Sequence, residues 1–357
     1  MRFIAAFKVY GVCLALVLAA TLPAMGQLPV EFHRGVNYAH THRGGRGYGS
    51  EVSAQTLREL YKNGVRYVAL TPFGYQRTYD AEHIRGIGGG DPSDRLLRDE
   101  VKSAHAAGMK VLLKPHIWSN DFWSSRGSNQ WHGTIDQKNP AAHARWWQDH
   151  RKLILHLAKL AEDTGIEMYC LGTELVKMTT KHATQWRELI GDVRKIYRGK
   201  LTYAAHWHEE LQKIEFWKDL DYIGVSAYFP LDAPVGADAK TLEAAWVPHV
   251  KRLRRLHVRV GKPVMFLEAG YRAVDNCHRE PWAYNGGQPD AGAQARAYDA
   301  MFSALANKPW FRGIYYWKAF TDPARGHHHG NSPGFAIHGK PAQQVVRSWY
   351  APADERK

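Results

Sequence analysis

The chain has 357 residues, 45% of them apolar, and a formal net charge of +14 at neutral pH. This length and apolar share are typical of a globular protein with a large core and exclude a disordered chain. The basic excess would permit contact with nucleic acids or anionic surfaces. However, the lysines and arginines are scattered along predicted helices, as in residues 251–255, and no nucleic-acid-binding motif accompanies them. We therefore predict a solvated basic surface and no nucleic-acid partner.

The first 26 residues have the layout of a secretory signal peptide. Arg2 and Lys8 precede an almost wholly apolar run over residues 9–20, and small residues near position 26 offer a cleavage site. An uncleaved membrane anchor is the alternative. We expect an exported protein, periplasmic or secreted, with no other membrane contact. The mature part, residues 27–357, is predicted to be one domain and a monomer.

Short apolar runs alternate with helix-length amphipathic segments along the rest of the chain. One predicted helix takes Ser53 as its N-cap and ends at Gly64. The runs predicted to be strands are residues 33–38, 65–71, 109–116, 166–174, 201–207, 221–228, 262–268 and 313–317. Eight such alternations in a chain of this size predict an α/β fold of the (β/α)8 TIM-barrel type. An open doubly wound sheet is the alternative, but no glycine-rich phosphate-binding motif follows an early strand.

Two of the predicted core strands end in a carboxylate, Glu174 on the fourth and Glu268 on the seventh. Active sites of such barrels lie at the C-terminal ends of the strands, where a carboxylate pair suits glycoside hydrolysis. A separation of about 5–5.5 Å would suit a nucleophile and an acid, and about 6.5–9.5 Å would admit a water. The residues that we predict to bind a sugar at the same end are Asn37, Thr71, His116, Trp118, Thr173, His206, Tyr228 and Trp317.

The loops beyond these strands carry further candidates. The aromatic segments 118–131 and 281–289 are expected to form the walls of a cleft. Glu209, Glu210 and Asp322 are expected to be solvated or to bind distant subsites.

The chain resembles glycoside hydrolase family 113 in four motifs, which are Thr173-Glu174-Leu175, Leu267-Glu268-Ala269-Gly270-Tyr271, Tyr315-Tyr316-Trp317-Lys318 and residues 334–342. The resemblance extends from about residue 33 to residue 350. It implies a retaining glycosidase of the large barrel clan, with endo-β-mannanase as the best-known activity. It also implies that Glu174 is the acid/base and Glu268 the nucleophile, that Tyr228 hydrogen-bonds the nucleophile, and that Trp317 floors the subsite of the cleaved sugar.

One position departs from the wider clan. Most members carry Asn before the acid of the fourth strand, where it grips the sugar 2-hydroxyl, and this chain has Thr173. A hydroxyl can still donate or accept there. The resemblance therefore predicts glycoside hydrolysis more strongly than it predicts mannan as the substrate.

Two other functions are compatible with a barrel. A metal-dependent amidohydrolase would use a pair such as His40 and His42 together with His206, but Tyr228 and Trp317 stand where its further ligands belong. A non-catalytic sugar-binding barrel would use the aromatic residues alone. We expect no metal and no cofactor, and a polysaccharide or oligosaccharide as the partner.

Overall fold

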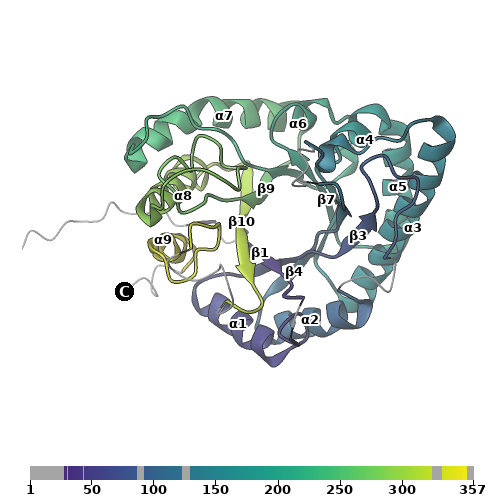
Figure 1. Ribbon diagram of the computed structural model, residues 1–357, viewed down its shortest axis with the longest axis horizontal. Coiled ribbons are helices and arrows are strands. Elements are labelled where there is room, and N and C mark those ends of the chain that lie inside the picture. Colours follow the sequence, from purple (N-terminus) through teal and green to yellow (C-terminus); the bar gives the residue numbers. More distant parts are fainter. Residues whose placement is uncertain are drawn as a thin grey trace, which may run out of the picture.

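The computed structural model describes residues 28–29, 31–42, 44–86, 92–122, 129–323 and 332–351. The predicted signal peptide, residues 1–26, lies outside these ranges. Inside them, strands and helices alternate along the chain and the strands surround a central axis (Figure 1). None of the helices within these ranges is both long enough and apolar enough to cross a membrane.

Eight of the described strands close into a parallel barrel, which confirms the predicted TIM-barrel fold. Around the barrel they are β1 (His33–Ala39), β10 (Phe311–Phe320), β9 (Val264–Ala269), β8 (Ile223–Ser226), β7 (Lys200–His206), β6 (Met168–Thr173), β4 (Lys110–Leu113) and β2 (Tyr67–Leu70). The first and last strands complete the ring, because Val36 of β1 lies opposite Val68 of β2 and opposite Tyr316 of β10.

Helices form the outer layer and follow the strands around the ring (Figure 1). They are α1 (Glu51–Lys62), α2 (Asp94–Ala106), α3 (Pro140–Thr164), α4 (Val176–Lys181), α5 (Ala183–Ile196), α6 (Glu210–Lys213), α7 (Ala239–Val260), α8 (Ala291–Leu305) and α9 (Pro341–Tyr350). The predicted N-cap of the first helix is wrong by one turn, since Ser50 caps it and accepts from the Ser53 amide. The Ser53 hydroxyl instead donates to Glu100 of α2 at 2.6 Å.

The period-two pattern of each strand divides the core into two layers. In β9, Met265 and Leu267 face the inside of the barrel, whereas Val264 and Phe266 pack against the helices. The inner layer is small and consists of Ala69, Leu112, Met168, Cys170, Ala204, Met265, Leu267 and Tyr315. Filling the inside with side chains makes the barrel a packed core, so a ligand can approach only at an end.

The predicted third strand, residues 109–116, is divided in two by Lys114 and Pro115. The barrel strand β4 ends at Leu113, and β5 (His116–Ser119) pairs instead with β3 (Phe73–Gln76) in a separate two-stranded sheet. Proline has no amide hydrogen for a ladder, which favours a break at this position. The break leaves Lys114 as the first residue beyond β4 and carries His116 into the extra sheet.

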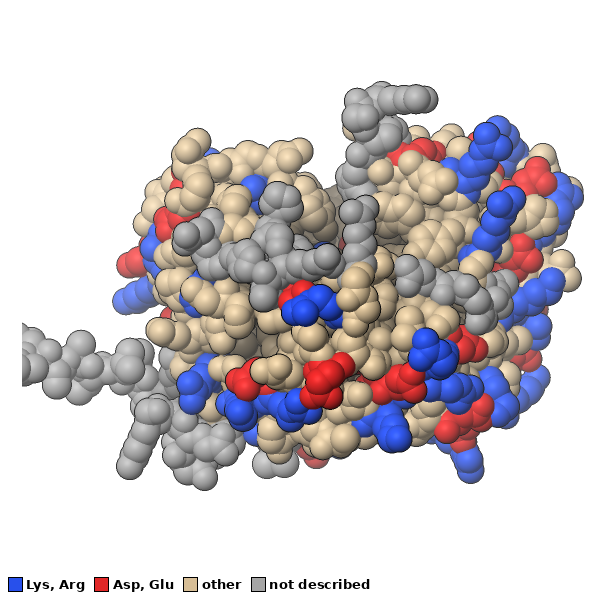
Figure 2. All heavy atoms as spheres, turned by 60° about the horizontal axis from the view of Figure 1, so that its bottom comes forward, with Lys and Arg blue, Asp and Glu red and all other residues tan. Residues whose placement is uncertain are grey.

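The surface mixes charges of both signs. Figure 2 shows that lysines and arginines are interspersed with acidic residues on the face that it presents. Many of them pair, as do Arg198 with Glu162 and Arg194 with Asp221. This mixture agrees with the solvated surface that the sequence predicts.

The close packing between β1 and β10 predicts the effect of a single methyl group. A Cβ added at Gly35 would lie 2.4–2.8 Å from the ring of Tyr315, which is fully buried. We expect Gly35→Ala to lower the free energy of unfolding in urea by roughly 1–3 kcal/mol.

Gly191 is the matched control, because it is exposed on α5 and an added Cβ would meet no atom within 4 Å. Gly191→Ala should raise the free energy of unfolding by about 0.5–1 kcal/mol through helix propensity. Equal effects of the two substitutions would contradict the packing that we describe.

Candidate active site

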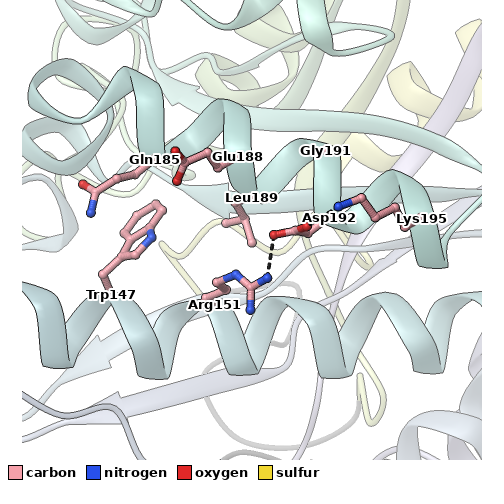
Figure 3. A pocket seen from close by; sticks show the side chains of 8 residues that line it. All are labelled: Trp147, Arg151, Gln185, Glu188, Leu189, Gly191, Asp192 and Lys195. Carbon is pink, nitrogen blue, oxygen red and sulfur yellow. Dashed lines mark hydrogen bonds and ion pairs between the residues drawn. The ribbon is translucent and has the colours of Figure 1, made fainter.

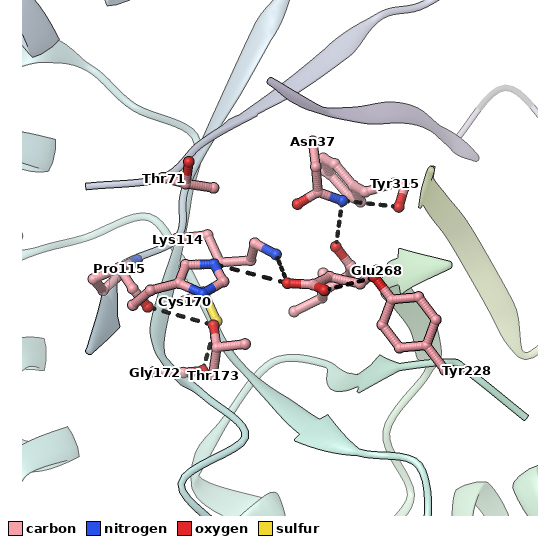
Figure 4. A network of polar contacts seen from close by, with 12 residues as sticks. Asn37, Thr71, Lys114, Pro115, Cys170, Gly172, Thr173, Tyr228, Glu268 and Tyr315 are labelled. Carbon is pink, nitrogen blue, oxygen red and sulfur yellow. Dashed lines mark hydrogen bonds and ion pairs between the residues drawn. The ribbon is translucent and has the colours of Figure 1, made fainter. Parts of the chain in front are cut away.

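The C-terminal ends of the strands bring polar side chains from distant parts of the chain together. Figure 4 shows Lys114 and Tyr228 reaching the Glu268 carboxylate, with Asn37 bonded to backbone groups beside it and Thr71 standing apart. The ladder is irregular beside both candidate acids, between Cys170 and Thr173 in β6 and opposite Glu268 in β9. Such bulges at the rim of a barrel redirect side chains near active sites.

Glu268, the fifth residue of β9, is buried and held on both carboxylate oxygens. Lys114 donates to its Oε1, and the Tyr228 hydroxyl donates to its Oε2 at 3.0 Å. The Nε2 atom of His116 lies 3.7 Å from Oε1. A buried carboxylate with a paired ammonium and a phenol donor is fixed in orientation and compensated in charge.

Lys114 is the residue of this group that the sequence analysis did not single out. Its side chain is completely buried, and its ammonium also lies 5.4 Å from the centre of the Trp317 ring. The available signal was its position directly after the apolar residues 111–113, because a lysine buried at the end of a core strand requires an anionic partner.

Glu174 follows β6 directly and is partly buried. Its backbone has φ of 54°, in the left-handed region that residues other than glycine rarely adopt, and its amide donates to the Ala204 carbonyl at 2.9 Å. Burial raises the pKa of Glu174 well above its usual range, and the negative charges of Glu268 and Glu210 raise it further. The Lys114 ammonium opposes this shift.

The two candidate acids therefore occupy different environments. Glu268 has a cation and a phenol as direct partners, whereas burial and neighbouring carboxylates raise the pKa of Glu174. Two carboxyl groups with such contrasting surroundings can act as a nucleophile and an acid.

Neutral imidazoles and aromatic rings surround this pair. Burial and then the Lys114 charge lower the pKa of His132 to about 4, and the same two causes hold the pKa of His116 well below its usual range. Trp317 is partly exposed, and its ring centre lies 6.5 Å from that of His116. Lys318 stands 4.5 Å over the Trp317 ring, and burial lowers its pKa to about 8.

Three of the predicted sugar-binding residues are buried, and the side chains of two of them are bonded to backbone carbonyls. The Asn37 amide donates to the carbonyls of Leu267 and Tyr315 at 2.9 and 3.0 Å, which ties β1 to two other strands. The Thr173 hydroxyl donates to the Pro115 carbonyl at 3.3 Å. Thr71 is buried directly after β2.

The remaining predicted residues belong to the surrounding aromatic walls. Trp118 of β5 meets His132 and Phe122 edge to face, with ring centres 6.5 and 5.9 Å apart. The ring centre of His206, at the end of β7, lies 4.8 Å from the ring centre of Trp131. Of the two predicted walls, 281–289 is described throughout, while residues 123–128 of the other lie outside the described ranges.

Two of the three loop acids are not solvated. Glu210 is completely buried, and Asp322 is 2% exposed and accepts from Arg46 at 2.5 Å. Glu209 is exposed, as predicted, and pairs with Lys213. Adjacent residues at a helix face different sides, and the sequence alone does not show whether Glu209 or Glu210 is the one that faces the interior.

A groove of about 460 Å³ lies elsewhere, between α3 and α5 on the outside of the barrel. Figure 3 shows Arg151 of α3 reaching Asp192 of α5 across it, beside Trp147. None of the residues converging on Glu268 lines this groove. The chemistry that the site can support therefore lies at the barrel mouth and not between these helices.

The histidines expected of a metal hydrolase do not assemble a ligand set in the described ranges. The rings of His40 and His42 are 4.9 Å apart, and Nδ1 of His40 accepts the Tyr48 amide at 2.8 Å. Across the described residues, no three His, Cys, Asp or Glu side chains cluster as metal ligands would.

Comparison with known proteins places this geometry in a family. Residues 36–340 match the family model described as Glycoside Hydrolase Family 113. A GH113 β-1,4-mannanase is similar in structure, with a TM-score of 0.77 and 25% identity over 89% of this chain and 98% of that chain. The GH113 β-mannanase AaManA from Alicyclobacillus acidocaldarius, in complex with ManMIm, has a TM-score of 0.77 and 28% identity, covering 89% and 97%.

A β-glucuronidase of Faecalibacterium prausnitzii shares only the fold, with a TM-score of 0.59 and 13% identity over 90% of this chain and 49% of that chain. No curated protein matched the chain.

The buried Lys114–Glu268 pair predicts a large effect on stability. Lys114→Met should leave a buried carboxylate without its cation and lower the free energy of unfolding near pH 7 by roughly 3–5 kcal/mol. Lys159→Met is the control, because Lys159 forms a solvent-exposed pair with Asp163 in α3. Urea denaturation should show a change of less than about 1 kcal/mol for the control. Similar losses for both variants would argue against Lys114 as the counter-ion of Glu268.

Proposed function

Because the chain belongs to glycoside hydrolase family 113, we propose that it hydrolyses β-glycosidic bonds with retention of configuration, using Glu174 and Glu268. The observation that carries the assignment is the contrast between the two acids. Glu268 is fixed by Lys114 and Tyr228, whereas Glu174 has no cation bound to it among the described residues and has its pKa raised by burial and by Glu268.

The proposed reaction has two steps. In the first, a Glu268 oxygen attacks the anomeric carbon while Glu174 gives its proton to the departing glycosidic oxygen, which leaves a glycosyl ester on Glu268. The ester is uncharged, so the repulsion from Glu268, one of the effects that raise the pKa of Glu174, is removed. Glu174 can then take a proton from a water that attacks the same carbon, which restores both acids.

The surrounding residues are assigned supporting roles. Tyr228 orients the nucleophile through its hydrogen bond, and Trp317 offers an indole face to the cleaved sugar. Neutral His116 and Thr173 lie beside the acids and can exchange hydrogen bonds with sugar hydroxyls. Asn37, Thr71, Trp118 and His206 complete the proposed substrate-binding set.

We propose a β-1,4-linked mannan or manno-oligosaccharide as the substrate, cleaved internally. The support is the similarity to two GH113 mannanases at 25% and 28% identity. The signal-like segment over residues 1–26 supports export to the periplasm or the medium.

The acid/base role of Glu174 is tested by its amide variant. Glu174→Gln should lower kcat on substrates with poor leaving groups by roughly 10²–10⁴-fold and leave binding intact. Aryl glycosides with acidic leaving groups should be affected much less in their first step, since they need no proton. The alkaline limb of the wild-type pH–rate profile should disappear in the variant, because deprotonation of Glu174 produces that limb.

Glu268→Ala is the paired experiment, with azide added to both variants. Azide should restore turnover in both, giving a β-glycosyl azide with the Glu174 variant and an α-glycosyl azide with the Glu268 variant. Identical products from the two variants, or unchanged kcat in either, would overturn the assignment.

The substrate is tested by release of reducing sugars from a panel of polymers. Mannan and glucomannan should be cleaved into several oligosaccharide sizes from the earliest time points, as internal cleavage requires. Xylan and cellulose should be poorer substrates. Cleavage of another polymer in preference to mannan would replace the substrate while keeping the reaction.

A further inference from the structure

Glu210 opens α6 and is a completely buried carboxylate outside the acid pair. Its Oε1 accepts from the hydroxyls of Thr179 and Tyr203 at 2.7 and 2.8 Å, and its Oε2 accepts from the His206 amide at 2.6 Å. Among the described residues no lysine, arginine or histidine side chain forms an ion pair with it. Burying a carboxylate costs free energy unless hydrogen bonds compensate for its lost hydration, and here three donors provide that compensation.

These hydrogen bonds lead to the backbone beside Glu174. The Tyr203 hydroxyl that donates to Glu210 also accepts the amide of Leu175, at 2.6 Å. Thr179 lies on α4, the short helix that begins directly after Leu175. Glu210 thus holds the residue after Glu174 through one hydroxyl and the following helix through another.

The segment held in this way is strained. Glu174 has φ of 54°, a conformation that costs of order 1 kcal/mol or more and persists only when the surroundings impose it. We propose that Glu210 is a positioning residue for Glu174, which acts through Tyr203 and Thr179 to fix the left-handed turn that carries the acid. This inference rests on the proposed function, in which Glu174 is the acid/base.

The charge of Glu210 supports the same role. Burial raises the pKa of Glu210 to about 7, although its three hydrogen-bond donors act in the opposite direction. Above that pH Glu210 is an anion. Its charge then raises the pKa of Glu174, in addition to the effects of burial and of the Glu268 charge. Among the described residues, the other ionisable groups that act on or respond to Glu174 are the Lys114 ammonium and the phenols of Tyr228 and Tyr284.

This charge effect fixes the direction in which a substitution at Glu210 should move the pH profile. Removing the negative charge of Glu210 should let Glu174 lose its proton at lower pH, so the alkaline limb of kcat/KM should move to lower pH. Removing the Tyr203 hydroxyl breaks its hydrogen bonds to both Leu175 and Glu210 and should loosen the turn, but the Glu210 carboxyl remains, so the limb should move less than it does without that carboxylate.

The test compares three variants of the full chain. Glu210→Gln should move the alkaline limb down by roughly one pH unit and lower kcat on poor leaving groups about tenfold or more. Tyr203→Phe should lower kcat on the same substrates while moving the limb less than Glu210→Gln does. Glu209→Gln is the matched control, since it removes the same charge from the exposed neighbouring residue, and it should change neither quantity.

Leaving groups separate positioning from misfolding. If Glu210 positions the acid, activated aryl glycosides should keep most of their kcat/KM in Glu210→Gln, because kcat/KM reports the first step, which needs no proton for these leaving groups. A loss of equal size on activated and poor leaving groups at every pH would indicate only less folded enzyme and overturn the inference. So would a Glu210→Gln profile that matches Glu209→Gln.

The result is distinguishable from failure of the proposed function. If Glu174→Gln shows no dependence on leaving group, the acid assignment itself is wrong. If Glu174→Gln behaves as an acid variant while Glu210→Gln behaves as the control, only the role of Glu210 is wrong.

Discussion

The site depends on one buried ion pair, between the ammonium of Lys114 and the carboxylate of Glu268. Each charge would cost several kcal/mol if it were buried alone, so the two stabilise each other only when β4 and β9 are held in the same closed ring. Tyr228 on the other carboxylate oxygen then leaves little freedom to the side chain. The barrel is therefore the condition under which this carboxylate can be buried, charged and oriented at once.

Glu174, the second acid, acquires the opposite electrostatic surroundings from the same closed barrel. Glu174 has no cation bound to it among the described residues. Its burial and the negative charges of Glu268 and Glu210 raise its pKa. These effects favour its neutral form, which is the form that a proton donor needs. One strand-end geometry thus gives identical side chains contrasting surroundings, with an ion pair at Glu268 and a raised pKa at Glu174, and the difference lies in what the neighbouring strands contribute.

The backbone around the acids is irregular where the rest of the barrel is regular. The ladder shifts register just before Glu174, whose own φ is positive, and again opposite Glu268. The hydrogen bonds from Glu210 through Tyr203 to Leu175 stabilise this departure from strand geometry. Strain concentrated at the chemistry and opposed by a buried network is what functional sites in rigid folds commonly show.

The sequence by itself determined the eight alternating strands and helices, the end of the barrel that carries polar residues, and the two acids placed there. These follow from local periodicity and from the rule that parallel strands end at one edge. Only the tertiary structure decided the partners: Lys114 for Glu268, Glu210 for the turn at Glu174, and the separate pairing of His116 in β5. Such contacts join residues up to 154 positions apart, and burial and charge compensation exist only once the chain has closed, so no local pattern could contain them.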